Sequence, residues 1–171
     1  MKLEFITSPA RALNILRDGC YFIDRTLPVD ERGISFSHPA GAGGASTGKE
    51  VGAKVICRWP GTIIEGAPPL NQDGYQGTEI AGMPGNLYLD TVRSRAFLPV
   101  GTNNQLKMYG IEFYDRAVLD AYVREKMAEE YSSLVSRLLF LKVTDEKVKR
   151  ESERMIRVYK DIGERKFNLV F

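Results

Sequence analysis

Histidine, cysteine and tryptophan are scarce in this chain of 171 residues, which contains one, two and one of them respectively. The single histidine, His38, excludes the zinc hydrolases that hold their metal with several histidines. Cys20 and Cys57 are isolated in the sequence, so they match neither a metal-binding spacing nor a disulfide framework. We therefore expect no metal site and two reduced, buried thiols.

A large excess of charge of one sign is lacking too. The 24 Lys and Arg side chains nearly balance the 22 Asp and Glu side chains, and a net charge of +2 does not indicate a nucleic-acid or acidic-lipid partner by itself. No apolar run approaches the length that spans a bilayer, and the start "MKLEFITSPARALN" lacks the pattern of a secretory signal. The expectation is a cytoplasmic protein without a membrane partner.

What the chain does contain is typical of one compact globular domain over residues 1 to 171. Hydrophobic residues make up 43% and charged residues 27%. The first segment predicts a strand in "KLEFI", a helix over about residues 9 to 18 and a strand in "CYFID". Ser8 is the expected N-cap of this helix, Pro9 its first residue and Gly19 its stop. Further strands are predicted in "ISFS", "AKVICRW", "RAFLPVG" and "LKMYGIEFY".

The second half is predicted to begin with loops and to end with helices. From about Pro60 to Asn104 the chain is rich in Gly, Pro and Asn, and long loops of this kind commonly bind ligands or partners. Asp115 is predicted to cap a long helix, and Thr144 a second one. Their apolar residues advance by three or four and indicate core packing: Leu119, Val123, Met127, Tyr131, Leu134, Leu138 and Leu141, then Val148, Met155, Tyr159 and Ile162.

The glycine-rich stretch "GAGGASTGKE" has the spacing of a phosphate-binding P-loop from Gly43 to Lys49. A working P-loop needs a Ser or Thr hydroxyl after the lysine to hold magnesium, but this chain has Glu50 there. The strand-like "GAKVICRW" also follows where a helix is required. A nucleotide hydrolase is therefore disfavoured, and a weaker anion-binding loop stays open. The absence of a GxSxG motif disfavours a serine hydrolase built on His38.

Three segments in order resemble the ADP-ribosyltransferase family. "FITSPARALNILRDGCYF" is similar to its opening strand and helix, "GISFSH" to its second strand of the form "GvYFS", and "RSRAFLPVG" to the strand that carries its catalytic glutamate. The last is similar to "AEFLV" of the DNA-modifying DarT toxin branch. The resemblance spans most of residues 1 to 115 and implies an α+β fold with a split, mixed β-sheet core, flanking helices and two C-terminal helices.

Two positions depart from the family pattern. Phe5 stands where the family has His or Arg, and Arg95 and Ala96 stand where it has the glutamate. Either the alignment is out of register, or the protein is inactive, or Ala96 is an engineered replacement. If Ala96 is natural, Glu79 in "GTEIAG" and Glu112 in "YGIEFYD" are the substitute carboxylates; a solvated glutamate is the alternative for each.

The resemblance implies NAD as co-substrate. Cleavage of the bond between nicotinamide and ribose passes through an oxocarbenium-like state, which a carboxylate stabilises. Phe36 would form a wall for the nicotinamide ring, or else face the core. Arg25 and Arg32 would pair with the diphosphate, or else be surface charges. The expected hydrogen-bonding neighbours of NAD are Thr7, Ser8, Ser35 and Ser37. His38 is a further candidate contact, or else a surface residue.

The resemblance therefore implies a transferase that moves ADP-ribose from NAD to a macromolecule, nucleic acid or protein, as a toxin or effector. The loop from Pro60 to Asn104 would meet this acceptor. Two rival hypotheses remain open: a noncatalytic interaction protein of similar fold, and a phosphate-binding protein that uses Gly43 to Lys49.

Overall fold

The computed structural model describes residues 1–28, 31–37, 51–68, 70–71, 74–75, 85–100, 106–132 and 141–170. Its helices are α1 (Pro9–Asp18), α2 (Arg116–Tyr131) and α4 (Asp145–Tyr159). The mixture of helices and several sheets confirms the α+β class. The strands are β1 (Lys2–Thr7), β2 (Cys20–Phe22), β3 (Gly33–Phe36), β4 (Ala53–Arg58), β5 (Ile63–Glu65), β6 (Leu70–Asn71), β7 (Gly74–Tyr75), β8 (Leu87–Asp90), β9 (Arg95–Pro99), β10 (Lys107–Phe113), β11 (Arg165–Lys166) and β12 (Asn168–Val170).

Helix α1 has the predicted boundaries because both of its ends are capped locally. The Ser8 hydroxyl accepts a hydrogen bond from the Arg11 amide at 3.2 Å, and Pro9 occupies the first turn. Gly19 has φ 64° and donates its amide to the Ile15 carbonyl at 2.8 Å. The left-handed conformation favours glycine, so the helix stops there.

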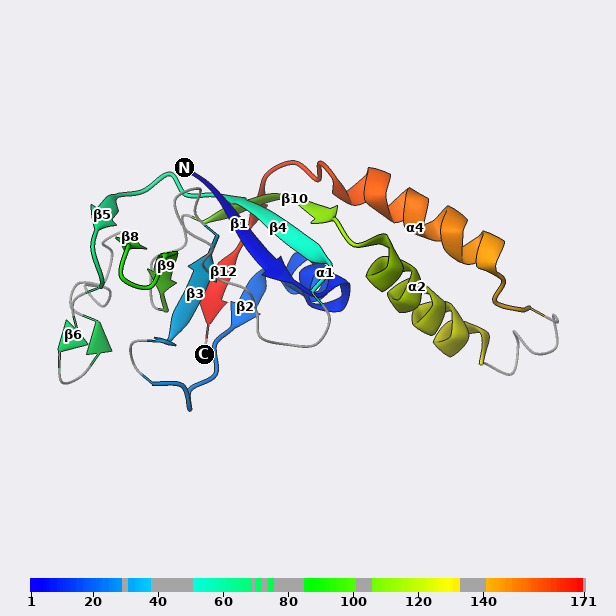
Figure 1. Cartoon of the computed structure of the whole chain (residues 1–171), viewed down its shortest axis with the longest axis horizontal. Helices are drawn as coiled ribbons and strands as arrows, with labels where there is room; N and C mark the ends of the chain where they lie inside the picture. Colours follow the sequence, from blue (N-terminus) through cyan, green and yellow to red (C-terminus); the bar gives the residue numbers. More distant parts are fainter. Residues whose placement is uncertain are drawn as a thin grey trace.

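Two four-stranded sheets form the body of the molecule. One has the order β1-β4-β10-β11 and the other has the order β3-β9-β8-β5. The second is mixed, because β5 pairs with β8 in parallel while β3, β9 and β8 are antiparallel. A bridge between Glu4 and Ser37 links the two sheets where β1 meets β3. Figure 1 shows β5, β8 and β9 at one end of the molecule and α2 and α4 at the other.

The hydrophobic core is formed by α1, one face of the strands and the buried residues of α2 and α4. Burial alternates along β1, β3 and β4, as expected for strands with one buried face. Phe5 packs edge-on against Tyr21 and Phe36, with ring centroids 5.2 and 6.4 Å apart. Among the most deeply buried members of this core are Leu3, Ala12, Ile34, Phe36, Val55, Cys57, Trp59, Ala96, Leu98, Met108 and Ile111.

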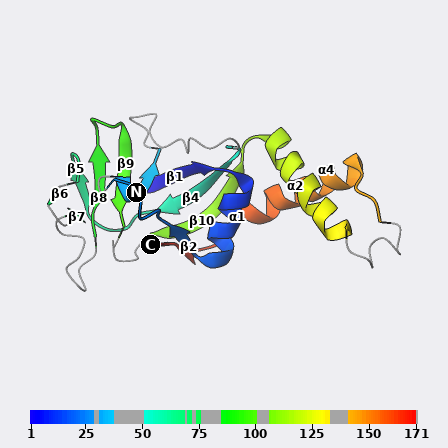
Figure 2. The same ribbon diagram turned by 90° about the horizontal axis from the view of Figure 1, so that it is seen from below.

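Helices α2 and α4 lie side by side and extend away from the sheets, as Figures 1 and 2 show. Their predicted caps are confirmed: Asp115 accepts from the amides of Ala117 and Val118, and Thr144 accepts from the amide of Lys147. The predicted apolar stripe extends past α2, which ends at Tyr131. Leu134 and Leu138 lie outside the described residues, and Leu141 is exposed and outside α2.

The expectation of a purely helical end was wrong, because β11 and β12 follow α4. Strand β12 pairs in parallel with β2, and the Asn168 amide donates to the Gly19 carbonyl at 3.0 Å. This pairing joins positions about 150 residues apart, from Cys20 to Asn168, so the local pattern of the last segment did not indicate it.

Both cysteines are free, but only Cys57 is fully buried; Cys20 is half-buried, contrary to expectation. Burial raises the pKa of the Cys57 thiol. In the part of the chain that the structure describes, no helix is long and apolar enough to cross a bilayer.

Candidate functional site

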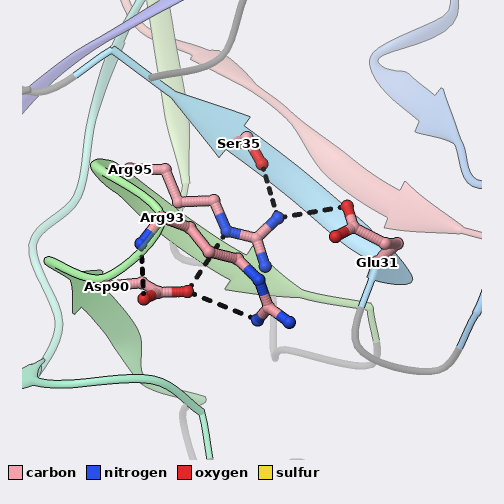
Figure 3. A network of polar contacts seen from close by, with 5 residues as sticks. All are labelled: Glu31, Ser35, Asp90, Arg93 and Arg95. Atoms are coloured by element: carbon pink, nitrogen blue, oxygen red, sulfur yellow. Dashed lines mark hydrogen bonds and ion pairs between the residues drawn. The ribbon is translucent and has the colours of Figure 1, made fainter. Parts of the chain in front are cut away.

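A network of charged side chains lies on the face of β3, β9 and β8 opposite the hydrophobic core (Figure 3). Arg95 stands at the start of β9, opposite Asp90 in the pairing with β8. Its Nε lies 3.4 Å from Asp90 Oδ2, and one terminal nitrogen donates to both Glu31 Oε2 and Ser35 Oγ at 3.2 Å. The network therefore joins the segment before β3, β3 itself, β8 and β9.

The network is buried to very different degrees. The side chains of Asp90 and Arg95 are 0% and 6% exposed, whereas the Glu31 side chain is 45% exposed. A buried charge is costly unless it is paired, so removal of either partner of the Asp90–Arg95 pair would destabilise the protein, and the pair is not free to bind. Glu31 is different, because its carboxylate is reached by solvent while it accepts a hydrogen bond from Arg95.

The turn between β8 and β9 brings Arg93 to Asp90 as a second arginine beside Arg95. The Arg93 amide donates to Asp90 Oδ1 at 3.1 Å, and the Arg93 guanidinium lies 3.5 Å from Asp90 Oδ2. Figure 3 shows the guanidinium groups of Arg93 and Arg95 on the same side of the carboxylate. The Arg93 side chain is 41% exposed, so this second cation remains accessible to solvent.

Ser94 in this turn has φ 50°, a left-handed conformation that costs a non-glycine residue about 1 kcal/mol or more. We expect Ser94→Gly to stabilise the protein by about 1 kcal/mol, less the entropy that glycine loses on folding. Urea unfolding monitored by circular dichroism measures this change. A lower unfolding midpoint would contradict a strained turn.

The aromatic ring beside the network belongs to Phe97. The guanidinium carbon of Arg95 lies 4.1 Å from the centre of this ring, which is a favourable cation–π geometry. A Cβ added at Gly33 would lie 2.5 Å from the same ring and 2.5 Å from the Leu98 carbonyl oxygen. Glycine at position 33 therefore allows Phe97 to pack across β3 beneath Arg95.

Ala96 and Phe36 face away from this network. They are register partners in the β3–β9 pair, and both side chains are 0% exposed in the hydrophobic core. Phe36 thus takes its alternative role as a core residue instead of lining an accessible wall. A glutamate at position 96 would bury an unpaired carboxylate in the core. Of the two residues at the expected glutamate position, only Arg95 lies on the polar face.

Of the other proposed NAD contacts that the structure describes, Ser35 joins the network. Thr7 is buried at the end of β1 and its hydroxyl oxygen has no hydrogen-bond partner, while the Ser8 hydroxyl is used as the cap of α1. The Ser37 amide donates to the Glu4 carbonyl at 2.8 Å. Arg25 is exposed; Arg32 is half-buried and donates to the Leu27 carbonyl at 2.9 Å.

Of the two proposed substitute carboxylates, the structure describes Glu112, which does not meet this site. Glu112 is exposed on β10, opposite Lys54 of β4 in the other sheet. Glu79, His38 and the Gly43 to Lys49 loop lie outside the described residues. Within the described ranges, no group of three or more His, Cys, Asp or Glu side chains is arranged to hold a metal ion.

Sequence reasoning missed Glu31 and Asp90, and it noted Arg95 only as a mismatch. A local signal existed for Asp90, because Asp at the start of a turn followed by "TVRS" commonly accepts from the amides that follow. No such signal existed for Glu31. It lies 64 positions from Arg95 in the chain, and only the pairing of β3 with β9 brings the two together.

Comparisons with protein-family models, with curated proteins and with solved structures find no significant match to this chain.

Proposed function

We propose that this chain is an NAD-dependent ADP-ribosyltransferase that modifies a macromolecule. One observation carries the proposal: the three segments that resemble this family are neighbours in space. The Glu4–Ser37 bridge joins β1 to β3, and β3 pairs with β9 over four register positions, although about 60 residues separate Ser35 from Arg95. An ADP-ribosyltransferase-like split sheet, with β1 between the two halves, is therefore the fold that we propose.

The residues on the polar face fit the chemical groups of NAD. Guanidinium groups bind diphosphates through paired hydrogen bonds, and Arg93, whose side chain is 41% exposed, presents one at the edge of the network. A carboxylate and a hydroxyl can hold ribose hydroxyls, and Glu31 and Ser35 supply these groups next to Arg95. In the described part of the chain, Glu31, Ser35 and Arg93 are the side chains that we assign to NAD, while Arg95 positions Glu31 and Ser35.

Glu31 takes the role of the missing family glutamate in this proposal. Arg95 occupies the position of that glutamate on the polar face, and the Glu31 carboxylate lies 3.2 Å from the Arg95 guanidinium. NAD, when bound, supplies the bond between ribose and nicotinamide whose cleavage builds positive charge on the ribose. The carboxylate of Glu31 would orient the ribose and offset that charge, as in glycoside cleavage.

Measurement of nicotinamide release from NAD, with calorimetry of NAD binding, tests the proposal. We expect Glu31→Gln to lower release at least about 100-fold, the usual effect of losing one group that stabilises developing charge. Glu112→Gln is the matched control, because it makes the same change on an exposed strand residue of the other sheet. Single-stranded DNA and protein extracts, offered separately as acceptors, distinguish the two classes of macromolecule.

Absence of NAD binding by the unmodified chain would overturn the proposal and favour a noncatalytic interaction protein of this fold. Equal loss in the Glu31→Gln and Glu112→Gln proteins would overturn the assignment of Glu31. If Glu79→Gln abolished nicotinamide release while Glu31→Gln retained it, Glu79 would take the role of the family glutamate. Glu79 is one of the two carboxylates that the sequence suggested.

A further inference from the structure

A groove is lined by residues of α2 and α4 and by Leu13 of α1. Figure 2 shows α2 and α4 at the opposite end of the molecule from β8 and β9. Its volume is about 430 Å³. Pockets that bind small molecules typically measure about 300 to 1,000 Å³ and combine an apolar lining with a few polar groups. The groove therefore has the size of a site for a compact ligand.

The floor and one wall of the groove are aromatic and apolar. The stripe of α2 is buried at Leu119 and Val123, where α1 covers it, but Met127 and Tyr131 further along are only half-buried. Tyr122 and Tyr159 also line the groove. Burial raises the pKa of the Tyr122 hydroxyl, as expected for a phenol partly removed from water. Three tyrosine side chains thus line the groove, where they can pack against the ring of a ligand.

The opposite wall is cationic. Lys147, Arg150 and Arg154 project from successive turns of α4, and together with Lys126 they outnumber the two carboxylates of the lining, Glu130 and Glu151. The Lys147 ammonium lies 5.3 Å from the centre of the Tyr131 ring. A positive charge beside an aromatic face is a combination that suits a ligand with both an anion and a ring.

The two arginines differ in how they are held. Arg154 makes hydrogen bonds of 2.8 and 2.6 Å to Glu151, but both side chains are partly exposed, and such pairs are weak in water. Arg150 makes no ion pair with any residue in the described ranges, although it lies near enough to help Arg154 lower the pKa of Glu151. Within the described ranges the Arg150 guanidinium thus has no ion-pair partner, and the Arg154 guanidinium can exchange its carboxylate for a phosphate.

We propose that this groove binds a phosphate-bearing ligand with an aromatic ring, of mononucleotide size. The phosphate contacts Arg150 and Arg154, and the ring packs against Tyr131 beside Met127. The site is separate from the proposed NAD site, since it is formed by the helices at the other end of the molecule.

Calorimetric titration of the full chain with AMP tests this site, with inorganic phosphate and adenosine as separate probes. We expect AMP to bind more tightly than either fragment. The double substitution Arg150→Gln with Arg154→Gln should weaken AMP at least about tenfold, because two charged hydrogen-bond donors are lost. The matched control is Lys149→Gln with Arg157→Gln, which removes the same charge from exposed positions of α4 that do not line the groove.

Three results would overturn the assignment. The first is the absence of saturable AMP binding at millimolar concentration, and the second is an equal affinity for AMP in the double variant and in its control. The third is binding that Glu31→Gln abolishes and the double variant retains, which would assign AMP to the β3–β9 site. A Tyr131→Leu protein, folded by circular dichroism, should lose the preference for AMP over inorganic phosphate; retention of that preference would contradict the stacking of the ring.

Discussion

Replacing Arg95 with methionine is expected to destabilise the protein by about 3 kcal/mol, the cost of leaving a buried carboxylate without its partner. Asp90 is 0% exposed, and the Arg95 side chain that pairs with it is 6% exposed. Arg93 also approaches Asp90, at 3.5 Å, so part of the charge stays compensated and the effect should fall at the low end of the range. Urea unfolding of the two proteins measures the difference.

A surface ion pair provides the control for this substitution. Lys126 and Glu129 on α2 lie 2.7 Å apart, with side chains 52% and 58% exposed. Lys126→Met removes an equivalent contact in solvent and should cost less than about 1 kcal/mol. Equal losses in the two variants would show that burial of Asp90 does not set the stability of the β8–β9 hairpin. The Asp90→Asn, Arg95→Met double variant should recover part of the loss, because no charge remains buried.

The second large effect is expected at Gly110, where the end of α4 crosses β10. A Cβ at this position would lie 2.3 Å from the Lys160 carbonyl oxygen and 3.0 Å from its carbonyl carbon. Both atoms belong to the backbone, so rotation of a side chain cannot relieve the clash. Gly110→Ala should cost about 2 to 3 kcal/mol, typical of overpacking, since α4 or the irregular pairing at Met108 and Gly110 must shift.

Gly163→Ala is the matched control because it is the same substitution in open space. Nothing lies within 4 Å of its added Cβ, and only the positive φ of 66° opposes the change. The expected cost is about 1 kcal/mol. Circular dichroism during urea unfolding compares both variants. A Gly110→Ala protein no less stable than Gly163→Ala would contradict the close approach of α4 to β10.

Arg95 and Glu31 differ in what their substitution changes, because one is needed for stability and the other is exposed. Arg95 holds Asp90 in a buried pair, so loss of activity in an Arg95 variant would not separate binding from folding. Glu31 is suited to that experiment because its side chain is 45% exposed and Arg95 keeps its partner in Asp90. Glu31→Gln also preserves the shape of the side chain and one oxygen that can accept from Arg95.

The sequence by itself determined the features that depend on near neighbours in the chain. The boundaries of α1 and the starts of α2 and α4 were predictable because Ser8, Gly19, Asp115 and Thr144 cap the helices through atoms no more than four residues away. The strand-like composition of "KLEFI", "ISFS" and "AKVICRW" likewise predicted β1, β3 and β4. The apolar run of β9 was also recognisable, although not which of its side chains would enter the hydrophobic core and which would meet the charged network.

Only the tertiary structure decided the candidate site. Alternation along β9 puts Arg95 and Ala96 on opposite faces, but pairing with β3 determines that Ala96 enters the core and Arg95 meets Ser35. A shift of one residue in that register would exchange the two faces. The contacts of Arg95 with Ser35 and Glu31 span 60 and 64 positions of the chain. Such contacts depend on how whole strands assemble, and no local spacing encodes them.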